Sequence, residues 1–235
     1  MIRLLLLITL VASMSLGGCS SSTVPTATSL PAVTSSPSEP SSFLMQPGLG
    51  EGVFILSNYL VKFPVYGVQI IALAQNNTDK LITTPEYVSA DFLDASDKKI
   101  GSAFGLLHNV PPHSVKIFLM AGTDQVPNYA RVTFKIGRVT EGNTDYDKIK
   151  IGQPTLFNNL NGTHLRVPID NRSESPKSVV LIAGFFDANG KIVGSATGGR
   201  LNLNPGTHEL TLDSEEIVSN FTRIEVQLDS LLDIM

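Results

Sequence analysis

The chain has 235 residues, a formal net charge of −4 at pH 7, and charged residues at only 16% of its positions, compared with roughly 25% in a typical globular protein. The negative balance gives a nucleic-acid partner no electrostatic support. A single cysteine excludes an internal disulfide, and 19 glycines with 14 prolines indicate many turns rather than a bundle of long helices.

The N-terminus predicts a lipoprotein signal peptide over residues 1–18. Arg3 supplies a positive start, and the apolar stretch from Leu4 to Val11 is far shorter than the ~20 residues of a membrane-spanning helix. The following Leu16-Gly17-Gly18-Cys19 resembles the lipobox of bacterial lipoproteins, which implies a lipid on Cys19 and cleavage before it. We therefore expect a lipid-anchored, extracytoplasmic protein of the bacterial cell envelope. The alternative is an ordinary secreted protein whose cysteine has no such role.

Residues 19–47 are predicted to form the lipidated cysteine and a linker. Ser, Thr and Pro occupy 18 of the 28 positions from Ser20 to Pro47, and Glu39 is the only charged residue there. Such a segment has too little apolar surface to offset the entropy of ordering, so we expect a disordered tether. In a cell with two membranes, Ser20 directly after the cysteine favours the outer one, by resemblance to known sorting behaviour.

The remainder of the chain contains a repeat of about 93 residues. Phe92–Ser102 matches Phe185–Ser195, and Pro112-His113 matches Pro205-Gly206 in the same register. A duplication of this size indicates two similar domains, which we place at residues 48–141 and 142–235.

Alternation of apolar and polar residues between turn signals predicts short antiparallel strands in both domains. The predicted strands are 53–61, 67–75, 86–93, 99–107, 114–120 and 129–137 in the first domain, then 148–157, 163–170, 178–187, 191–199, 207–212 and 222–229 in the second. The two predicted cores contain, respectively, Val88, Ala90, Phe92 and Phe134, and Leu181, Ala183, Phe185 and Val226. The predicted fold class is all-β, with two tandem antiparallel β-sandwiches of immunoglobulin-like type behind the disordered Ser/Thr/Pro-rich tether.

The repeated motifs resemble those of the FxLYD family. The second repeat contains them as Asn171, Phe186-Asp187, Asn189-Gly190-Lys191, Gly194 and Leu203-Asn204-Pro205-Gly206, and the first keeps Asn77, Asp94, Lys98, Gly101 and Pro112. This resemblance implies immunoglobulin-like β-sandwich domains of bacterial envelope proteins. It also implies a binding or spacing module outside the cytoplasm and supplies no catalytic residue.

The sequence predicts no catalytic site, metal site or cofactor. Its histidines, which have no cysteine partner and no i, i+4 pair, are His108, His113, His164 and His208. No Gly-x-Ser-x-Gly motif occurs, and Asp94 and Asp187 are interpreted as turn residues. The Asn-x-Ser/Thr positions Asn76, Asn161, Asn171 and Asn220 are likewise interpreted as turn residues.

The predicted strand 178–187 is apolar on both faces. Opposite the core residues of this strand lie Val180, Ile182 and Phe186, whereas the first repeat has the more polar set Tyr87, Ser89, Asp91 and Leu93. Exposed hydrophobic surface of this kind usually has a partner. We therefore expect these three residues to contact either the first domain or an external protein.

Together these features predict a non-enzymatic, lipid-anchored envelope protein whose tandem sandwiches bind or position a protein or an envelope polymer. Two alternatives remain: a small-ligand-binding or enzymatic envelope lipoprotein, and an inert structural spacer. The fold alone does not separate them, because sandwiches have many functions.

Overall fold

The computed structural model describes residues 52–55, 58–64, 67–82, 86–107, 109–136, 145–159 and 162–233. The described residues, between 52 and 233, belong to one compact unit. The chain is all-β and contains two antiparallel sheets, as its sequence predicts. Over the ranges given above, no helix is long and apolar enough to cross a membrane. The predicted signal peptide, Cys19 and the predicted tether lie outside the described residues.

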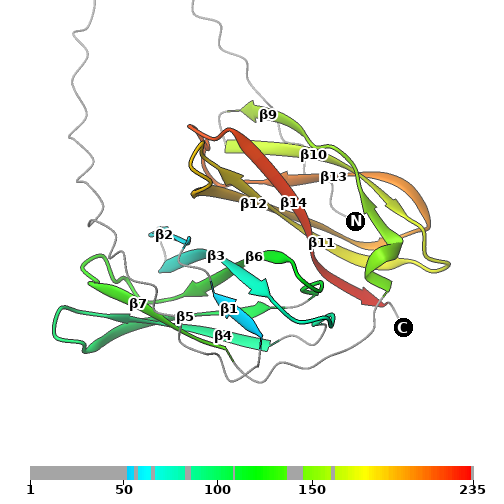
Figure 1. Ribbon diagram of the computed structural model, residues 1–235. Helices are drawn as coiled ribbons and strands as arrows, with labels where there is room; N and C mark the ends of the chain where they lie inside the picture. The colour runs from blue at the N-terminus through cyan, green and yellow to red at the C-terminus, as the bar shows by residue number, and fades with distance from the viewer. Residues whose placement is uncertain are drawn as a thin grey trace, which may run out of the picture. The chain divides into compact units, whose positions relative to one another are not determined.

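The first sheet contains seven strands (Figure 1). They are β1 (Val53–Ile55), β2 (Leu60–Lys62), β3 (Val68–Asn76), β4 (Glu86–Leu93), β5 (Lys99–Leu107), β6 (Val115–Gly122) and β7 (Arg131–Ile136). Their order across the sheet is β1-β3-β6-β5-β4-β7, and β2 also pairs with β3.

The second sheet repeats this arrangement strand by strand. After a short 3-10 helix (Asp145–Lys148) come β8 (Ile149–Ile151), β9 (Thr155–Asn159), β10 (Gly162–Asn171), β11 (Lys177–Phe186), β12 (Ile192–Leu203), β13 (Gly206–Asp213) and β14 (Arg223–Asp233). Their order is β8-β10-β13-β12-β11-β14, with β9 paired to β10. The predicted strands are confirmed, except that 53–61 and 148–157 are each two strands and that β12 and β14 each run four residues further than expected.

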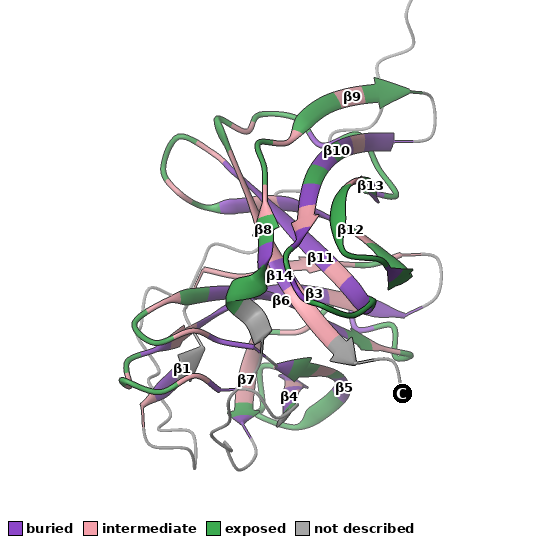
Figure 2. Cartoon of the chain, turned by 90° about the vertical axis from the view of Figure 1, so that its right-hand side faces the viewer, coloured by how far each residue is buried: buried purple, intermediate pink, exposed green. Residues whose placement is uncertain are grey.

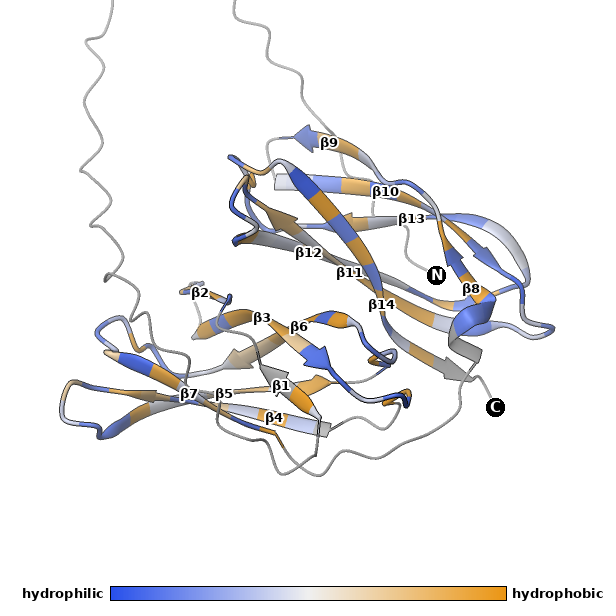
Figure 3. Ribbon diagram, viewed as in Figure 1, coloured by the Kyte–Doolittle hydropathy of each residue, from blue (hydrophilic) through white to orange (hydrophobic). Residues whose placement is uncertain are grey.

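Each sheet has its own apolar cluster, and the predicted core residues of both are confirmed. Val88, Ala90 and Phe92 of β4 are fully buried in the first cluster, and Phe134 packs against it. Leu181, Ala183 and Phe185 of β11 are fully buried in the second, and Val226 packs against it. Figure 3 shows the underlying pattern on β14, where hydrophobic and hydrophilic residues alternate.

The turns after β4 and β11 have the same hydrogen bonds. The Asp94 carboxylate accepts from the backbone N–H groups of Ser96 and Lys98, and the Asp187 carboxylate accepts from those of Asn189 and Lys191. The Ser96 hydroxyl and these backbone groups lower the pKa of Asp94. Both aspartates are therefore turn-forming residues, as the sequence indicates.

A buried asparagine closes β3 and β10 in the same way. The Asn76 side chain donates to the carbonyl of Val110, which precedes β6, and the Asn171 side chain donates to the carbonyl of Leu203, which precedes β13. Each asparagine therefore joins the end of its own strand to the segment before another strand of the same sheet. Each side-chain oxygen accepts from the residue two positions later. The sequence comparison assigned Asn77 to this role, which is wrong by one residue.

The two repeats differ at a turn residue with positive φ, which is His113 in the first repeat and Gly206 in the second. Gly206 has φ of 110° and open space around the position of a Cβ, whereas His113 has φ of 50°. A residue with a side chain loses roughly 1–2 kcal/mol of stability when the fold holds it in the left-handed region. Glycine instead costs about 0.4–1 kcal/mol of stability, because it gives the unfolded chain more conformational freedom. We expect Gly206→His to lower the free energy of unfolding by up to about 1.5 kcal/mol and His113→Gly to raise it by up to about 1 kcal/mol.

Urea denaturation of both variants measures these changes. A loss of stability in His113→Gly would mean that the exposed contact of His113 with Asp79, at 2.7 Å, outweighs the strain of its backbone.

Candidate functional site

The strand predicted to be apolar on both faces is β11, and Figure 2 shows it buried along most of its length. Ile182 and Phe186 lie in a third apolar cluster, which we call the inter-sheet cluster. Its buried members are Ile71, Leu73, Ile117, Ile182, Phe186 and Ile192. Val180, the remaining predicted contact residue, is half-buried and is not among them. The cluster joins β11 and the start of β12 in the second sheet to β3 and β6 in the first.

Gly184 permits this close approach. A Cβ atom at Gly184 would lie 2.8 Å from Cδ1 of Ile117, well inside van der Waals contact. The strand therefore reaches β6 at the one residue of β11 that has no side chain.

Two amide side chains form hydrogen bonds across the same contact. Gln227 of β14 accepts from the N–H of Ile117 at 2.8 Å and donates to the carbonyl of Val115 at 2.9 Å. Asn58, which precedes β2, donates to the carbonyl of Gly190 at 2.7 Å and accepts from the N–H of Ile192 at 3.0 Å. Gln227 therefore satisfies two backbone groups of β6, and Asn58 satisfies one in the turn before β12 and one at the first residue of β12.

A buried lysine makes a third polar connection between the sheets. The Lys116 side chain is 1% exposed, and its Nζ donates to the carbonyls of Leu228 and, at 3.3 Å, Asp229. Asp229 is the extra residue of a bulge in β14, since Leu228 pairs with Leu181 and Ser230 pairs with Val180. Burial lowers the pKa of Lys116 to about 8, although Asp229 opposes this shift.

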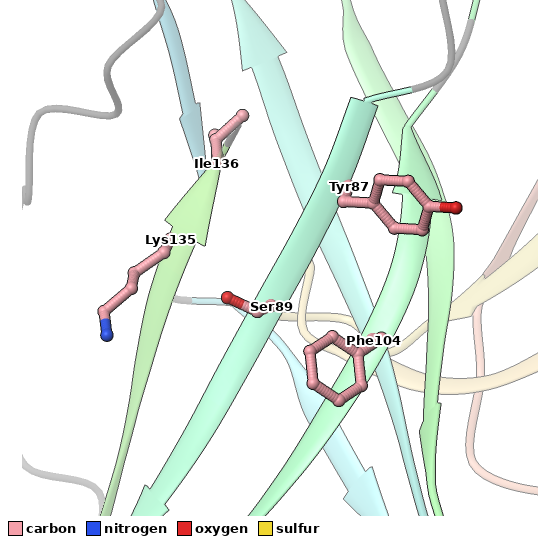
Figure 4. A pocket seen from close by; sticks show the side chains of 5 residues that line it. All are labelled: Tyr87, Ser89, Phe104, Lys135 and Ile136. Carbon is pink, nitrogen blue, oxygen red and sulfur yellow. The ribbon is translucent and has the colours of Figure 1, made fainter. Parts of the chain in front are cut away.

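The first sheet presents a different outer face on β4, β5 and β7. An open groove of about 470 Å³ is lined by Tyr87, Ser89, Phe104, Lys135 and Ile136. Figure 4 shows these side chains on three neighbouring strands. The Tyr87 and Phe104 side chains are 71% and 55% exposed, respectively, and Leu106 beside them is also exposed. Aromatic side chains exposed to this degree are candidates for a contact.

Charged residues border this groove. The Asp91 carboxylate forms ion pairs with Lys99 at 2.5 Å and with Lys135 at 3.2 Å. Burial opposes ionisation of Asp91, but the hydrogen bonds and charges of the two lysines outweigh it and lower its pKa. One carboxylate is thus shared by two ammonium groups.

Two of the four histidines make separate polar contacts. His113 contacts Asp79, and Nε2 of His208 donates to the carbonyl of Asn204 at 2.9 Å, whereas His108 lies outside the described residues. In the part of the chain that the structure describes, no group of three or more His, Cys, Asp or Glu side chains could hold a metal ion.

His164 lies in a separate side-chain stack on the hairpin of β9 and β10. Its Nδ1 is 2.6 Å from a carboxylate oxygen of Asp213, and its ring stacks on Phe157 with the centroids 5.1 Å apart. The Arg166 guanidinium lies 4.9 Å from the centre of the Phe157 ring. These contacts tie β9 to β10 and β13.

Sequence reasoning missed Asn58, Lys116 and Gln227. Asn58 and Gln227 belong to no motif, because each acts on backbone groups more than 100 residues away in the chain. Lys116 gave a usable signal, since alternation places this lysine on the same side of β6 as the core residues Phe118 and Met120.

No protein-family model, curated protein or solved structure matches this chain.

Replacing Ile182 with Asp tests the contribution of the inter-sheet cluster. The substitution would place an unpaired charge among buried aliphatic side chains, so we expect the free energy of unfolding to fall by about 3–5 kcal/mol. The matched control is Leu201→Asp, at a side chain that is 76% exposed, where the change should stay within about 0.5 kcal/mol. Equal effects of the two substitutions in chemical denaturation would contradict the assignment.

The buried lysine predicts a dependence of stability on pH. The unfolded chain keeps the proton of Lys116 up to its ordinary pKa of 10.5, whereas the folded chain releases it near pH 8. Between these values the unfolded state binds more protons, so the folded state gains stability as the pH rises, at about 1.4 kcal/mol per pH unit.

We therefore expect the wild type to gain this stability relative to Lys116→Met as the pH is raised from 8 to 10. Urea denaturation of both proteins at each pH removes the contributions of all other titrating groups. A constant difference between the two proteins would contradict the prediction.

Proposed function

We propose that this chain is a non-enzymatic, lipid-anchored protein of the bacterial cell envelope that binds or positions a protein partner. In this proposal Cys19 carries the lipid and the Ser/Thr/Pro-rich segment is a disordered tether. The two sheets form immunoglobulin-like sandwiches that present the binding surface. The sequence of residues 1–47 supports the anchor and the tether.

The distribution of core residues supports the sandwich. In the first sheet, β3 and β4 are separated in the strand order by β6 and β5, yet both contribute fully buried side chains to one cluster. In the second sheet, β10 and β11 do the same. Strands that are distant in a sheet share a core when the sheet folds over itself into two layers.

The observation that carries the binding function is the outer face of the first sheet. Tyr87 pairs with Leu106 and Ser89 pairs with Phe104, so the two aromatic rings and the leucine are neighbours on adjacent strands. Their exposed apolar surface contrasts with β11, whose outward residues Ile182 and Phe186 are covered by the first sheet. Contiguous exposed apolar surface is typical of an interaction site.

The lipid anchor is tested by Cys19→Ser. We expect this variant to leave the membrane fraction and to accumulate with its signal peptide uncleaved, while the matched variant Ser20→Ala stays in the membrane fraction. Fractionation followed by immunoblotting measures both changes. Membrane retention of Cys19→Ser at the wild-type level would contradict the proposed anchor.

Partner binding is tested by photo-crosslinking in cells. A photoreactive residue at Phe104 should yield a discrete crosslinked protein, and the same residue at Leu201 serves as the exposed apolar control. An identical pattern from both positions would contradict a specific binding face and favour the spacer.

A further inference from the structure

The outer face of β4, β5 and β7 is structurally equivalent to the face by which the second sheet contacts the first. Ala90 pairs with Ala103 and Phe134, and Ala183 pairs with Ala196 and Val226, so Ala90 and Ala183 occupy the same place. The outward neighbours then correspond as well. Ser89, Asp91, Leu93 and Lys135 stand where the second sheet has Ile182, Gly184, Phe186 and Gln227.

This equivalence allows the polar groups of the two faces to be compared. In the second sheet, Gln227 both donates to and accepts from the backbone of β6, because an amide has both kinds of group. Lys135 in the same place has only donors. A surface that docks against Lys135 must therefore offer acceptors where β6 offers an N–H and a carbonyl.

The charges on the face favour an anionic acceptor. Lys99 and Lys135 share the single carboxylate of Asp91, which leaves this group with a net charge of +1. Lys135 is also exposed, with 68% of its side chain accessible. A carboxylate on a partner would complete the second ion pair, and charge-assisted hydrogen bonds of this kind are stronger than neutral ones.

The apolar part of the face is displaced relative to that of the second sheet. Gly184, which lets β11 approach Ile117, is replaced by Asp91, so the centre of the face cannot pack on aliphatic side chains. Apolar surface lies instead on Tyr87, Phe104 and Leu106. Ser89 pairs with both Phe104 and Lys135, so these two residues lie on the strands on either side of β4, whose backbones are roughly 10 Å apart.

We propose that this face binds an acidic, extended segment of a partner protein. An apolar side chain of the segment packs on Tyr87, Phe104 and Leu106, and a carboxylate two residues away, on the same face of the segment, binds Lys135. Two residues of extended chain span about 7 Å, and the long side chain of Lys135 covers the remaining distance. The inference rests on the proposed function, because it names the partner's chemistry at the binding face.

A second copy of this chain is a poorer occupant. The same face on another molecule would set two groups of net positive charge against each other, which is unfavourable across an interface. A carboxylate for Lys135 could instead come from the outward side of β10 and β13 in the second sheet of another copy. There Glu209 already contacts Arg166 of its own chain at 4.0 Å.

The test uses the full chain and a fluorescent 12-residue peptide made of three Asp-Ser-Leu-Ser repeats. Alternate residues of an extended chain share a face, so Asp and Leu point the same way in this peptide. Fluorescence anisotropy should show at least tenfold tighter binding than for the Lys-Ser-Leu-Ser peptide. Phe104→Ser should weaken binding at least fivefold, Lys135→Glu should abolish the preference for Asp, and the matched control Leu201→Ser should leave binding unchanged.

Several results would overturn the inference. Two of them are equal affinity for the acidic and basic peptides and unchanged peptide binding by Phe104→Ser. The others are self-association of the wild-type chain that Phe104→Ser abolishes, and binding of an envelope polysaccharide but no peptide at this face. Thermal melting of each variant separates loss of binding from loss of folding. Crosslinks that form in cells from other positions, without peptide binding here, would overturn this site and leave the proposed function standing. Peptide binding without any crosslinked protein in cells would overturn the proposed function and leave the peptide-binding site standing.

Discussion

The contact between the two sheets includes a residue of β11 that has no side chain. Gly184 lets β11 approach Ile117 of β6, and this approach brings Ile182 and Phe186 against the aliphatic side chains of β3. The same approach brings Gln227 within hydrogen-bonding distance of the β6 backbone. A larger residue at this position would meet Cδ1 of Ile117 and the ring of Phe186, so these side chains would have to shift if the strands kept their separation.

The polar contacts close strand edges that the sheets leave open. β5 pairs with β6 only through Ala121 and Met120, and β12 pairs with β13 only through Thr197. An unpaired edge is a template for another chain. Gln227 covers part of the β6 edge and Asn58 covers the start of the β12 edge, so each sheet protects the other. In the first sheet Asp91 stands in the place of Gly184, which disfavours an identical apolar contact there.

The sequence was sufficient for the strands and the cores because both follow a period of two. The same period revealed Ile182 and Phe186, since apolar residues opposite a core are visible without a structure. The amide contacts of Asn58 and Gln227 were not predictable, because a side chain that binds the backbone of a distant strand leaves no pattern in its own neighbourhood. The position of Asn76 was missed by one residue because two asparagines are adjacent there, and only the register of β3 distinguishes them.

The apolar and polar contacts between the sheets have different roles. Burial of the aliphatic side chains is non-directional, so it favours association without choosing one alignment. The hydrogen bonds of Gln227 and Lys116 are directional, and their partners are individual backbone groups. Along a strand these groups alternate in direction, so sliding β14 past β6 by one residue would present Gln227 with groups that point away from it. It would also leave the buried Lys116 amine without its carbonyl acceptors, at a large cost in free energy. The apolar cluster therefore holds the sheets together, and the hydrogen bonds of Gln227 and Lys116 restrict them to a single register.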